Sequence, residues 1–425
     1  MKTILEPRAQ AFDRTPRSRR VLVLAGDAQG GLWIVRSLGR AGLTVFSVCA
    51  SRRALAAHSR FSSGAWALES SPRTPQFADE VAELARRLDT GSIMTMAEEY
   101  HLALIQNRGR FEPDVHVFSP SADCFAKATD KDYVHSLCSR IGVPVACGTR
   151  LDLLMADPSR MSLRFPLVLR TRQQVGLGTG SEAPWKAAYA ENPEQLADRY
   201  EQVRDRAANV LVQEYHPGVE DHAQVLMHRG EAFMVGEYIG EHHMPLAGGV
   251  TVLRTTCCHE NLLQDAVRLL KAIGWEGIAG VQFHYDPETG KYILLEINPR
   301  FIGGLPTVIM AGFDAPFLLW QSHFEPEKMR RGTYRLGLRT RILGGDANWM
   351  FAVLRGDPLP PGQKRPSKAS AIAQFLWRFM PWTRDDVFSW RDPVPFWVDL
   401  RMMAKMLRER SVDLIGAPHS PENPA

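Results

Sequence analysis

The sequence lacks most of the features that mark a secreted, membrane-spanning or nucleic-acid-binding protein. Its 425 residues include only six cysteines, with no CxxC pair and no zinc-type spacing, which is typical of a protein of the reducing cytoplasm. No run of 18 apolar residues occurs, so we expect no transmembrane helix. The net charge is only +4, and so weak a basic excess argues against a nucleic-acid partner. A phosphorylated small-molecule substrate is compatible with this charge.

Changes of pattern divide the chain into four predicted regions. Residues 1–19 are basic and contain no long apolar stretch, so we expect a disordered leader. Residues 20–125 alternate short apolar strands with amphipathic helices, which predicts a small α/β domain of Rossmann-like type. Residues 126–345 pair strands through hairpins interrupted by helices, an α+β pattern. Residues 346–425 form a region rich in proline and tryptophan with an amphipathic helix.

A glycine-containing turn at residues 26–31 leads from the first apolar strand into a helix. Dinucleotide-binding folds carry a G-x-G-x-x-G fingerprint at this position and an acid after the second strand. The turn does not match that fingerprint, and the second strand runs into Arg52 and Arg53. Two interpretations stay open: a tight strand-to-helix turn, or a loop that holds part of a substrate.

The strongest candidate for a chemical site lies in two predicted strands within residues 280–300. Side chains alternate along a strand, so Glu296 and Asn298 point to the same face. The hairpin between the strands can bring Gln282 beside them, which gathers three oxygen ligands of the kind that Mg²⁺ prefers. Arg300 projects to the same face, where its guanidinium can hold a phosphate. The competing interpretation is a strand end with a capping Asn and a surface ion pair.

Six segments follow one another in a characteristic order: residues 128–131, 165–170, 212–218, 248–250, 281–283 and 296–300. On these segments, the stretch from about residue 120 to 320 resembles the ATP-grasp superfamily, and within it the carbamoyl-phosphate-synthetase-like and carboxylate–amine ligase branch. The resemblance implies a two-lobed α+β ATP-grasp fold. It also implies that the Rossmann-like unit is a pre-ATP-grasp domain, followed after the ATP-grasp fold by an aromatic-rich helical C-terminal extension.

The resemblance implies a cofactor site for ATP and Mg²⁺, for which Mn²⁺ can substitute. Arg170 stands where many relatives carry a phosphate-binding Lys, and an Arg there can grip two phosphate oxygens. The expected metal ligands, with an amide where many relatives have a carboxylate, are Gln282, Glu296 and Asn298. The loop after the Arg170 strand offers backbone N–H groups to the phosphates at Gly176, Gly178 and Gly180.

Further residues of the nucleotide site follow from the same resemblance. Gln213, Glu214 and Tyr215 match the segment that joins the two lobes, whose backbone contacts adenine and whose acid holds the nucleotide. Glu220 resembles the acid that binds the ribose hydroxyls. Lys131 either contacts a phosphate or simply follows the N-cap residue of its helix.

Three arginines make up the expected catalytic set. Arg170 and Arg300 are expected to stabilise the transferring phosphoryl group. Arg254 is expected to bind the substrate carboxylate or the γ-phosphate, and its alternative is a solvated residue of a strand.

These features together predict an ATP- and Mg²⁺-dependent ligase that joins a small-molecule carboxylate to an amine through an acyl phosphate. Three alternatives stay open: another ATP-grasp phosphoryl-transfer enzyme with a different acceptor, a non-catalytic ATP-binding sensor, and an oxidoreductase built on the N-terminal unit, which the poor glycine fingerprint disfavours. We expect a cytoplasmic protein without nucleic-acid partners that forms a homodimer, as relatives often do. The sequence does not identify the carboxylate or the amine.

A predicted amphipathic helix covers residues 395–410, with apolar residues on one face and basic residues on another. Such a helix can lie on an anionic membrane surface as a weak peripheral contact. It can equally pack its apolar stripe on the body of the enzyme.

Overall fold

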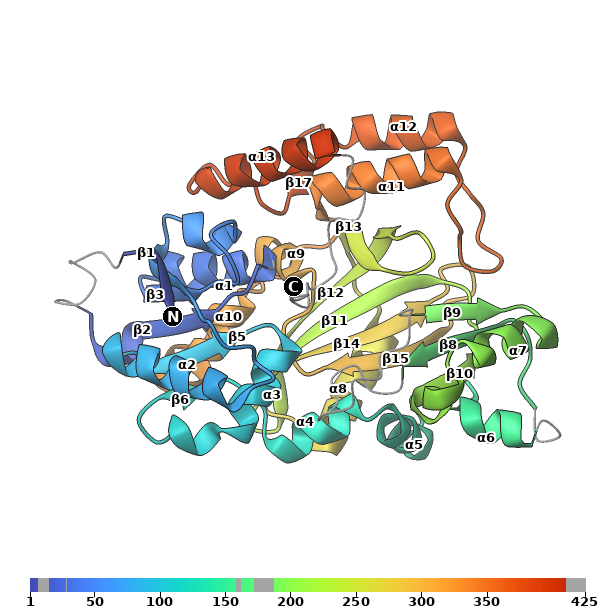
Figure 1. Ribbon diagram of the computed structural model, residues 1–425, viewed down its shortest axis with the longest axis horizontal. Helices are drawn as coiled ribbons and strands as arrows, with labels where there is room; N and C mark the ends of the chain where they lie inside the picture. Colours follow the sequence, from blue (N-terminus) through green and yellow to red (C-terminus); the bar gives the residue numbers. More distant parts are fainter. Residues whose placement is uncertain (7–14, 28, 158–161, 172–186, 410–425) are drawn as a thin grey trace.

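The computed structural model describes residues 1–6, 15–27, 29–157, 162–171 and 187–409, whose strands form three sheets (Figure 1). A six-stranded N-terminal sheet lies at one end of the molecule, a four-stranded sheet lies at the other, and a seven-stranded sheet lies between them. Each described helix falls short of the length and apolarity needed to cross a membrane.

The N-terminal sheet has the strand order β1-β4-β3-β2-β5-β6. Strands β2 to β6 run parallel, as the succession of strands and helices predicts, and β1 is antiparallel to β4. Apolar side chains on both faces bury the sheet between helices. The strands are β1 (Lys2–Leu5), β2 (Arg20–Leu24), β3 (Thr44–Val48), β4 (Ser62–Ala67), β5 (Ser92–Thr95) and β6 (His116–Val117). The helices are α1 (Gln29–Arg40), α2 (Pro75–Arg87) and α3 (Glu98–Gln106).

The first residues differ from the expected disordered leader. Lys2–Leu5 form β1, which pairs with β4 and packs Ile4 and Leu5 against the apolar core. An unpaired sheet edge leaves N–H and C=O groups without partners, and β1 satisfies those of β4. The prediction was wrong for this strand because a four-residue segment is too short to display a readable period.

The turn at residues 26–31 supports the tight-turn interpretation. A Cβ atom on Gly31 would clash with the backbone of Ala25, and one on Gly30 would clash with the side chain of Met96. The absence of side chains here lets α1 begin directly against the ends of β2 and β5.

The remaining strands form the two other sheets, and two hairpins of the kind expected within residues 126–345 are present as β11–β12 and β14–β15. The four-stranded sheet contains, in spatial order, β7 (Gly148–Arg150), β10 (Val210–Glu214), β8 (Leu167–Thr171) and β9 (Ala187–Ala190). The seven-stranded sheet contains β15 (Tyr292–Asn298), β14 (Gly277–Tyr285), β11 (Val219–His228), β12 (Glu231–Met244), β13 (Val250–Thr256), β16 (Arg339–Arg341) and β17 (Thr383–Asp385).

Helices cover both faces of the seven-stranded sheet. Helices α4, α5 and α8 pack on one face, where Leu269 and Phe283 belong to the same buried cluster. Helices α9 and α10 pack against α1, so the apolar core continues from the N-terminal unit into the larger sheet. The α-helices of this part are α4 (Ala122–Thr129), α5 (Lys131–Ile141), α6 (Leu151–Ala156), α7 (Pro193–Glu201), α8 (Glu260–Ile273), α9 (Leu305–Ala311) and α10 (Ala315–Phe324). Short 3₁₀ turns are η2 (Arg17–Arg19), η3 (Leu55–His58), η4 (Arg108–Arg110), η6 (Arg204–Asn209) and η7 (Pro326–Lys328).

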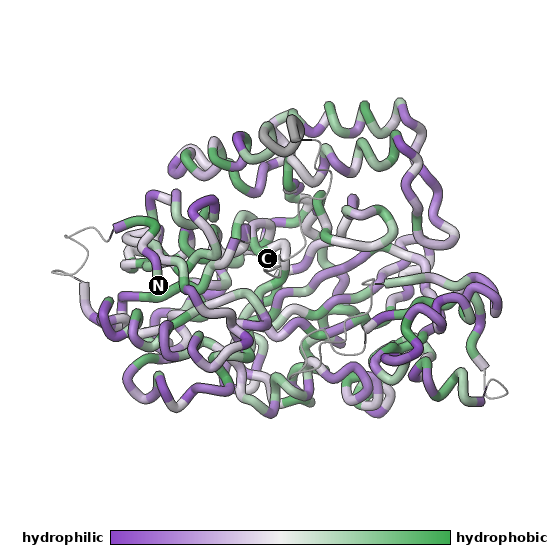
Figure 2. The backbone as a smooth tube through the Cα atoms, in the orientation of Figure 1, coloured by the Kyte–Doolittle hydropathy of each residue, from purple (hydrophilic) through white to green (hydrophobic). Residues whose placement is uncertain are grey.

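The C-terminal region runs back across the molecule as α11 (Leu343–Arg355), α12 (Lys368–Trp377), β17 and α13 (Val394–Glu409). Helix α11 contains the predicted boundary between residues 345 and 346, so this boundary does not separate two structural units. Strand β17 extends the large sheet parallel to β16. Figure 2 shows hydrophobic and hydrophilic segments alternating along α11 and α12, as expected of helices with one packed face.

Candidate functional site

The three predicted metal ligands share one face of the seven-stranded sheet. In the antiparallel pair β14–β15, Gln282 lies directly opposite Glu296, and Gly280 lies opposite Asn298. Directly opposite residues of an antiparallel pair project to the same side, so two amide groups and one carboxylate meet there. A bulge sets Phe283 opposite Leu294 and leaves the residue between Leu294 and Glu296 unpaired.

Lys131 approaches this face from the first turn of α5. Its Nζ lies 3.5 Å from Oε2 of Glu296 and donates a hydrogen bond to the carbonyl oxygen of Thr171 at 3.0 Å. Burial lowers the pKa of Lys131, Glu296 acts in the opposite direction, and Arg170 lowers it further. The N-cap prediction is also confirmed, because the Asp130 carboxylate accepts two backbone N–H groups.

Arg170 lies in β8, directly opposite Leu211 of β10. Its Nε is buried and has no hydrogen-bond partner among the residues that the structure describes. Burial of His284 lowers the pKa of this histidine to about 4, and the positive charge of Arg170 contributes to the shift. Two cationic side chains, Arg170 and Lys131, therefore face one site, an arrangement suited to an anion. The predicted phosphate-loop glycines lie outside the described residues: Gly176, Gly178 and Gly180.

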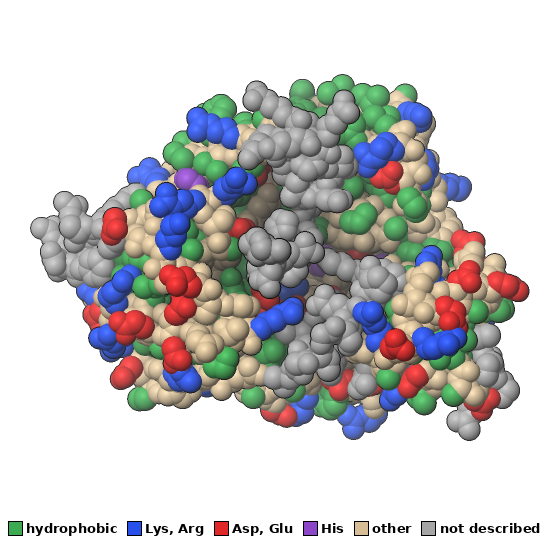
Figure 3. All heavy atoms as spheres, viewed as in Figure 1, with side chains coloured by type: hydrophobic (Ala, Val, Ile, Leu, Met, Phe, Trp, Pro, Cys, Tyr) green, Lys and Arg blue, Asp and Glu red, His purple; other side chains and the backbone are tan. Residues whose placement is uncertain are grey.

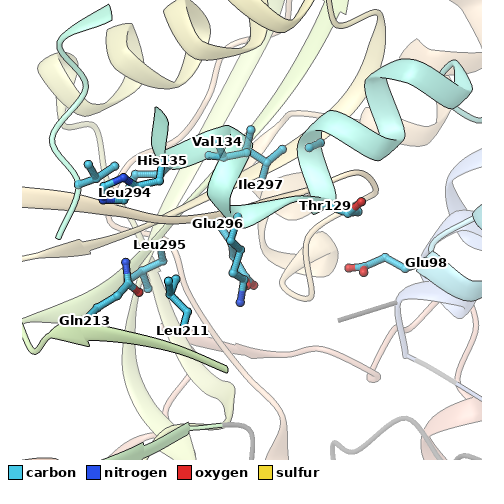
Figure 4. Close-up of a pocket in the computed structure, with 13 residues that line it drawn as sticks. Glu98, Thr129, Val134, His135, Leu211, Gln213, Leu294, Leu295, Glu296 and Ile297 are labelled. Atoms are coloured by element: carbon cyan, nitrogen blue, oxygen red, sulfur yellow. The ribbon is translucent and has the colours of Figure 1, made fainter. Parts of the chain in front are cut away.

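A pocket opens between these elements (Figure 4). Gln213 and Glu98 extend into it from opposite sides, with Glu296 between them. Lys131 and Leu295 also line its wall. The pocket thus contains residues of the four-stranded sheet, of the seven-stranded sheet and of the N-terminal unit.

Glu214 is the last residue of β10, and Tyr215 follows it. The carboxylate of Glu214 accepts a hydrogen bond from the backbone N–H of Arg164 at 3.0 Å and two longer ones from its guanidinium. Burial raises the pKa of Glu214, but these hydrogen bonds outweigh it and lower the pKa overall. The ring of Tyr215 packs edge-on against Tyr189, with the ring centroids 5.4 Å apart.

Glu220 sits in a polar cluster that the sequence prediction only partly anticipated. Its Oε2 lies 3.3 Å from Nε2 of His222 and 3.4 Å from Nε2 of His243, and it accepts a hydrogen bond from the Thr251 hydroxyl. Burial raises the pKa of Glu220, but the two imidazoles outweigh it and hold the pKa well below its ordinary value. Side chains alternate between the two faces of a strand, so the sequence of β11 could have shown that His222 shares a face with Glu220.

Arg300 connects the site to the N-terminal unit. Its Nε donates a hydrogen bond to Oε1 of Glu98 at 2.9 Å, and its Nη1 donates to the carbonyl oxygen of Phe301. Glu98 begins α3, just after the carboxyl end of the parallel strand β5. Ligand sites of parallel sheets gather at such strand ends, and this signal would have identified Glu98 from the sequence.

Arg254 is more enclosed than the sequence prediction implied. It is 1% exposed, pairs with the Asp386 carboxylate and donates a second hydrogen bond to the carbonyl oxygen of Thr251. Its guanidinium also stacks over the ring of Tyr238. The alternative interpretation of Arg254 as a solvated strand residue is wrong, because Asp386 of the C-terminal region covers it.

The chain is similar to several known proteins. A family model described as "ATP-grasp in the biosynthetic pathway with Ter operon" matches residues 206–343. The N-terminal section of the carbamoyl phosphate synthase large chain of Methanopyrus kandleri is 27% identical over 203 residues, which cover 44% of this chain and 34% of that protein. The chain thus spans about a third of the length of this curated relative.

Two solved structures share the fold at low sequence identity. The biotin carboxylase domain dimer of Hydrogenobacter thermophilus 2-oxoglutarate carboxylase, in complex with MgADP, ADP and bicarbonate, has a TM-score of 0.57 and 17% identity, covering 76% of this chain and 73% of that chain. N5-carboxyaminoimidazole synthetase of Staphylococcus aureus, complexed with ADP, has a TM-score of 0.57 and 12% identity, covering 75% of this chain and 80% of that chain.

Residues 206–343 are thus similar to an ATP-grasp family. The curated relative with which the chain shares 27% identity is a carbamoyl phosphate synthase large chain. Both similarities agree with the resemblance drawn from the sequence motifs.

Proposed function

We propose that the protein is an ATP- and Mg²⁺-dependent ligase that joins a small-molecule carboxylate to an amine. The observation that carries this proposal is the meeting of Gln282, Glu296 and Asn298 on one sheet face, with Lys131 and Arg170 beside them. Oxygen donors next to two cationic groups suit a metal-bound polyphosphate better than a free metal ion or a free anion.

The donor set fits Mg²⁺, and Mn²⁺ prefers the same oxygen ligands. Gln282, Glu296 and Asn298 supply only one negative charge, so phosphate oxygens would have to supply the rest. The bound metal would neutralise phosphate charge. Lys131, which lies beside Glu296, would then be free to contact a phosphate.

The nucleotide would extend from these ligands toward the end of β10. We propose that the backbone near Gln213 and Tyr215 holds the adenine ring and that Glu214 fixes this segment through Arg164. Glu220, kept ionised by its two histidine neighbours, would accept hydrogen bonds from the ribose hydroxyls. The glycines at 176, 178 and 180 keep their proposed role in covering the phosphates.

The reaction would proceed by two displacements. A carboxylate oxygen of the substrate attacks the γ-phosphorus of ATP, the bond between this phosphorus and the β–γ bridging oxygen breaks, and ADP leaves with that oxygen. The amine then attacks the acyl carbon, loses a proton, and releases phosphate that carries one former carboxylate oxygen. Arg170 and Arg300 would stabilise the charge on the transferring phosphoryl group.

Arg254 keeps a proposed role in binding the substrate anion. Asp386 and the carbonyl oxygen of Thr251 engage its terminal nitrogens. Its Nε is buried and has no partner within the described residues, so this N–H is the group we propose for the contact.

The experiment is an isotope-transfer assay with ATP, Mg²⁺ and pools of amino acids and other carboxylates labelled with ¹⁸O. A ligase releases ADP together with phosphate that contains ¹⁸O. It does so only when both a carboxylate and an amine are present. Phosphate that stays attached to a hydroxyl or thiol product would support the alternative phosphoryl-transfer enzyme. ATP binding without turnover under all conditions would support the sensor.

Two further proposals rest on the resemblance, a pre-ATP-grasp domain and a homodimer, and two rest on the few cysteines and the weak net charge, a cytoplasmic location and the absence of nucleic-acid partners. The N-terminal unit serves as a pre-ATP-grasp domain and contributes Glu98 to the site. The chain forms a homodimer, acts in the cytoplasm and binds no nucleic acid. Size measurement by light scattering tests the homodimer directly.

The C-terminal region supports the proposal of a weak membrane contact. Figure 3 shows hydrophobic side chains gathered along the edge formed by the C-terminal helices. Of the twelve large hydrophobic side chains that are exposed among the described residues, ten lie in this region: Phe351, Ile372, Leu376, Trp377, Phe379, Met380, Trp382, Trp390, Val394 and Trp397. Part of α13 nevertheless packs inward, because Phe396 and Met402 contact Leu32, Leu55 and Val387.

A further inference from the structure

A second cluster of polar side chains lies on the opposite face of the large sheet from Glu220. Side chains alternate along β11, so Asp221 points away from the nucleotide side. The register of β11 with β12 turns Glu237 to the same face as Asp221. Cys257, which follows β13, and His259, the N-cap residue of α8, complete the cluster.

These four side chains converge on one point. One potential metal-ligand atom from each lies within 4.8 Å of all the others. Nδ1 of His259 lies 2.8 Å from Oδ2 of Asp221 and 2.7 Å from Oε1 of Glu237. The backbone N–H of His259 donates to Oε2 of Glu237 at 2.8 Å, which fixes that carboxylate. The spacing is compatible with four ligands around a single small ion.

The charge of the cluster is incompletely balanced. Asp221 and Glu237 are 0% and 1% exposed, and across the described part of the chain neither forms an ion pair with Lys or Arg. One ring nitrogen of His259 serves both carboxylates. Oδ1 of Asp221 is buried and lacks any hydrogen-bond partner among the described residues. Buried carboxylates without full compensation are costly, so this site favours a cation.

We propose that Asp221, Glu237, Cys257 and His259 bind a structural Zn²⁺ ion. Zinc accepts nitrogen, oxygen and sulfur ligands together in a tetrahedral arrangement, whereas Mg²⁺ and Ca²⁺ select oxygen ligands. Four protein ligands leave no open coordination position, which is typical of a structural site. The sequence showed no zinc-type spacing because two ligands come from neighbouring strands and two from the loop before a helix.

The ion would join three elements behind the nucleotide site. Asp221 and Glu237 belong to β11 and β12, and His259 starts α8, which packs on the same face of the sheet. The ring of Tyr285 stacks on His259 with the centroids 4.0 Å apart and orients the imidazole. Because β11 carries Glu220 on its other face, the zinc would hold in place the strand that presents this nucleotide-site residue.

The experiment measures the metal content and cobalt spectrum of the full-length protein. We expect one equivalent of zinc after reconstitution and dialysis against metal-free buffer, measured by mass spectrometry of the metal. Replacement by Co²⁺ should give a thiolate-to-cobalt charge-transfer band together with the intense visible bands of a tetrahedral ion. Zinc that dissociates completely on dialysis, or a cobalt spectrum without the thiolate band, would overturn the proposal.

Matched variants assign the site. Cys257→Ser should remove the charge-transfer band and lower the zinc affinity at least tenfold, while Cys258→Ser, at the exposed neighbouring cysteine, should leave both unchanged. Asp221→Asn should also weaken zinc binding and serves if Cys257→Ser does not fold. Glu296→Gln should keep its zinc, because that residue lies in the proposed magnesium site. Equal zinc affinity in Cys257→Ser, Asp221→Asn and the wild type would contradict the assignment.

Discussion

Arg36 and Asp392 stand 356 positions apart in the chain and form an ion pair that excludes water almost completely. Nε of Arg36 lies 2.9 Å from Oδ2 of Asp392, and the two side chains are 0% and 1% exposed. The same carboxylate accepts hydrogen bonds from the Ser59 hydroxyl and the Arg60 backbone N–H. The segment between β17 and α13 is thereby fastened to the N-terminal unit, while Asp386 a few residues earlier holds Arg254 of the large sheet.

Removing this carboxylate should destabilise the whole protein. Asp392→Ala leaves the Arg36 charge buried without a partner, and we expect the free energy of unfolding to fall by about 3–5 kcal/mol. Denaturant unfolding measures this change. The control is Asp357→Ala, which breaks a pair with Arg355 whose side chains are 46% and 32% exposed and should cost no more than about 1 kcal/mol. Equal losses in the two variants would show that the buried pair has no special role.

Glu296→Gln should abolish ATP turnover while the fold stays intact. The substitution removes the one negative charge of the proposed metal ligands at a site without an apolar packing role. Phosphate release and thermal unfolding are measured side by side. Glu288→Gln, in the exposed turn of the same hairpin, is the control and should retain wild-type turnover. Normal turnover in Glu296→Gln would eliminate the metal assignment.

Arg170→Ala should cost about 2–4 kcal/mol in transition-state stabilisation, the range for losing one preorganised charge contact. Arg170→Lys should recover part of this loss, because the charge returns without the bidentate fork. The measurement is kcat/KM for ATP in both variants. If both match the wild type, Arg170 has only a structural role.

The sequence was sufficient to predict the elements that carry strong local patterns. Side chains alternate between the two faces of the strand that contains Glu296 and Asn298. The strand that precedes it in the hairpin could be aligned with it, which placed Gln282 beside these residues. Contacts between distant segments were not predictable in this way. The pairing of Arg254 with Asp386 and that of Arg300 with Glu98 join residues more than a hundred positions apart, and no local period encodes such a pairing. The zinc cluster was invisible for the same reason, since its ligands meet only when the sheet has formed.

The stability of the protein should fall between pH 6.5 and about 3, in part because of His101. Burial, with a smaller contribution from Arg300, lowers the pKa of His101 from 6.5 to about 3. Between these values the unfolded chain binds a proton that the folded protein excludes, so stability is lost as the pH falls. In His101→Gln the free energy of unfolding should therefore fall less steeply as the pH decreases. The slope against pH should be smaller by the equivalent of up to one bound proton. Ser119→Ala removes only the hydrogen-bond partner of the ring and should keep the wild-type slope. Identical slopes in His101→Gln and the wild type would refute this account.

The proposed membrane contact depends on aromatic side chains that the fold leaves exposed. Trp390, Val394 and Trp397 are 87%, 51% and 59% exposed, so replacing all three by Ser spares the packed residues Phe396 and Met402. We expect the wild type to co-sediment with anionic vesicles at low salt. The triple variant should bind at least about tenfold more weakly, because burying one large apolar side chain contributes about 1.5–3 kcal/mol. Binding should weaken at high salt and with neutral vesicles, because basic residues contribute through screened electrostatic attraction. If the wild type fails to co-sediment with anionic vesicles, or the variant binds equally well, α13 is not a membrane element and serves to pack against the body of the protein.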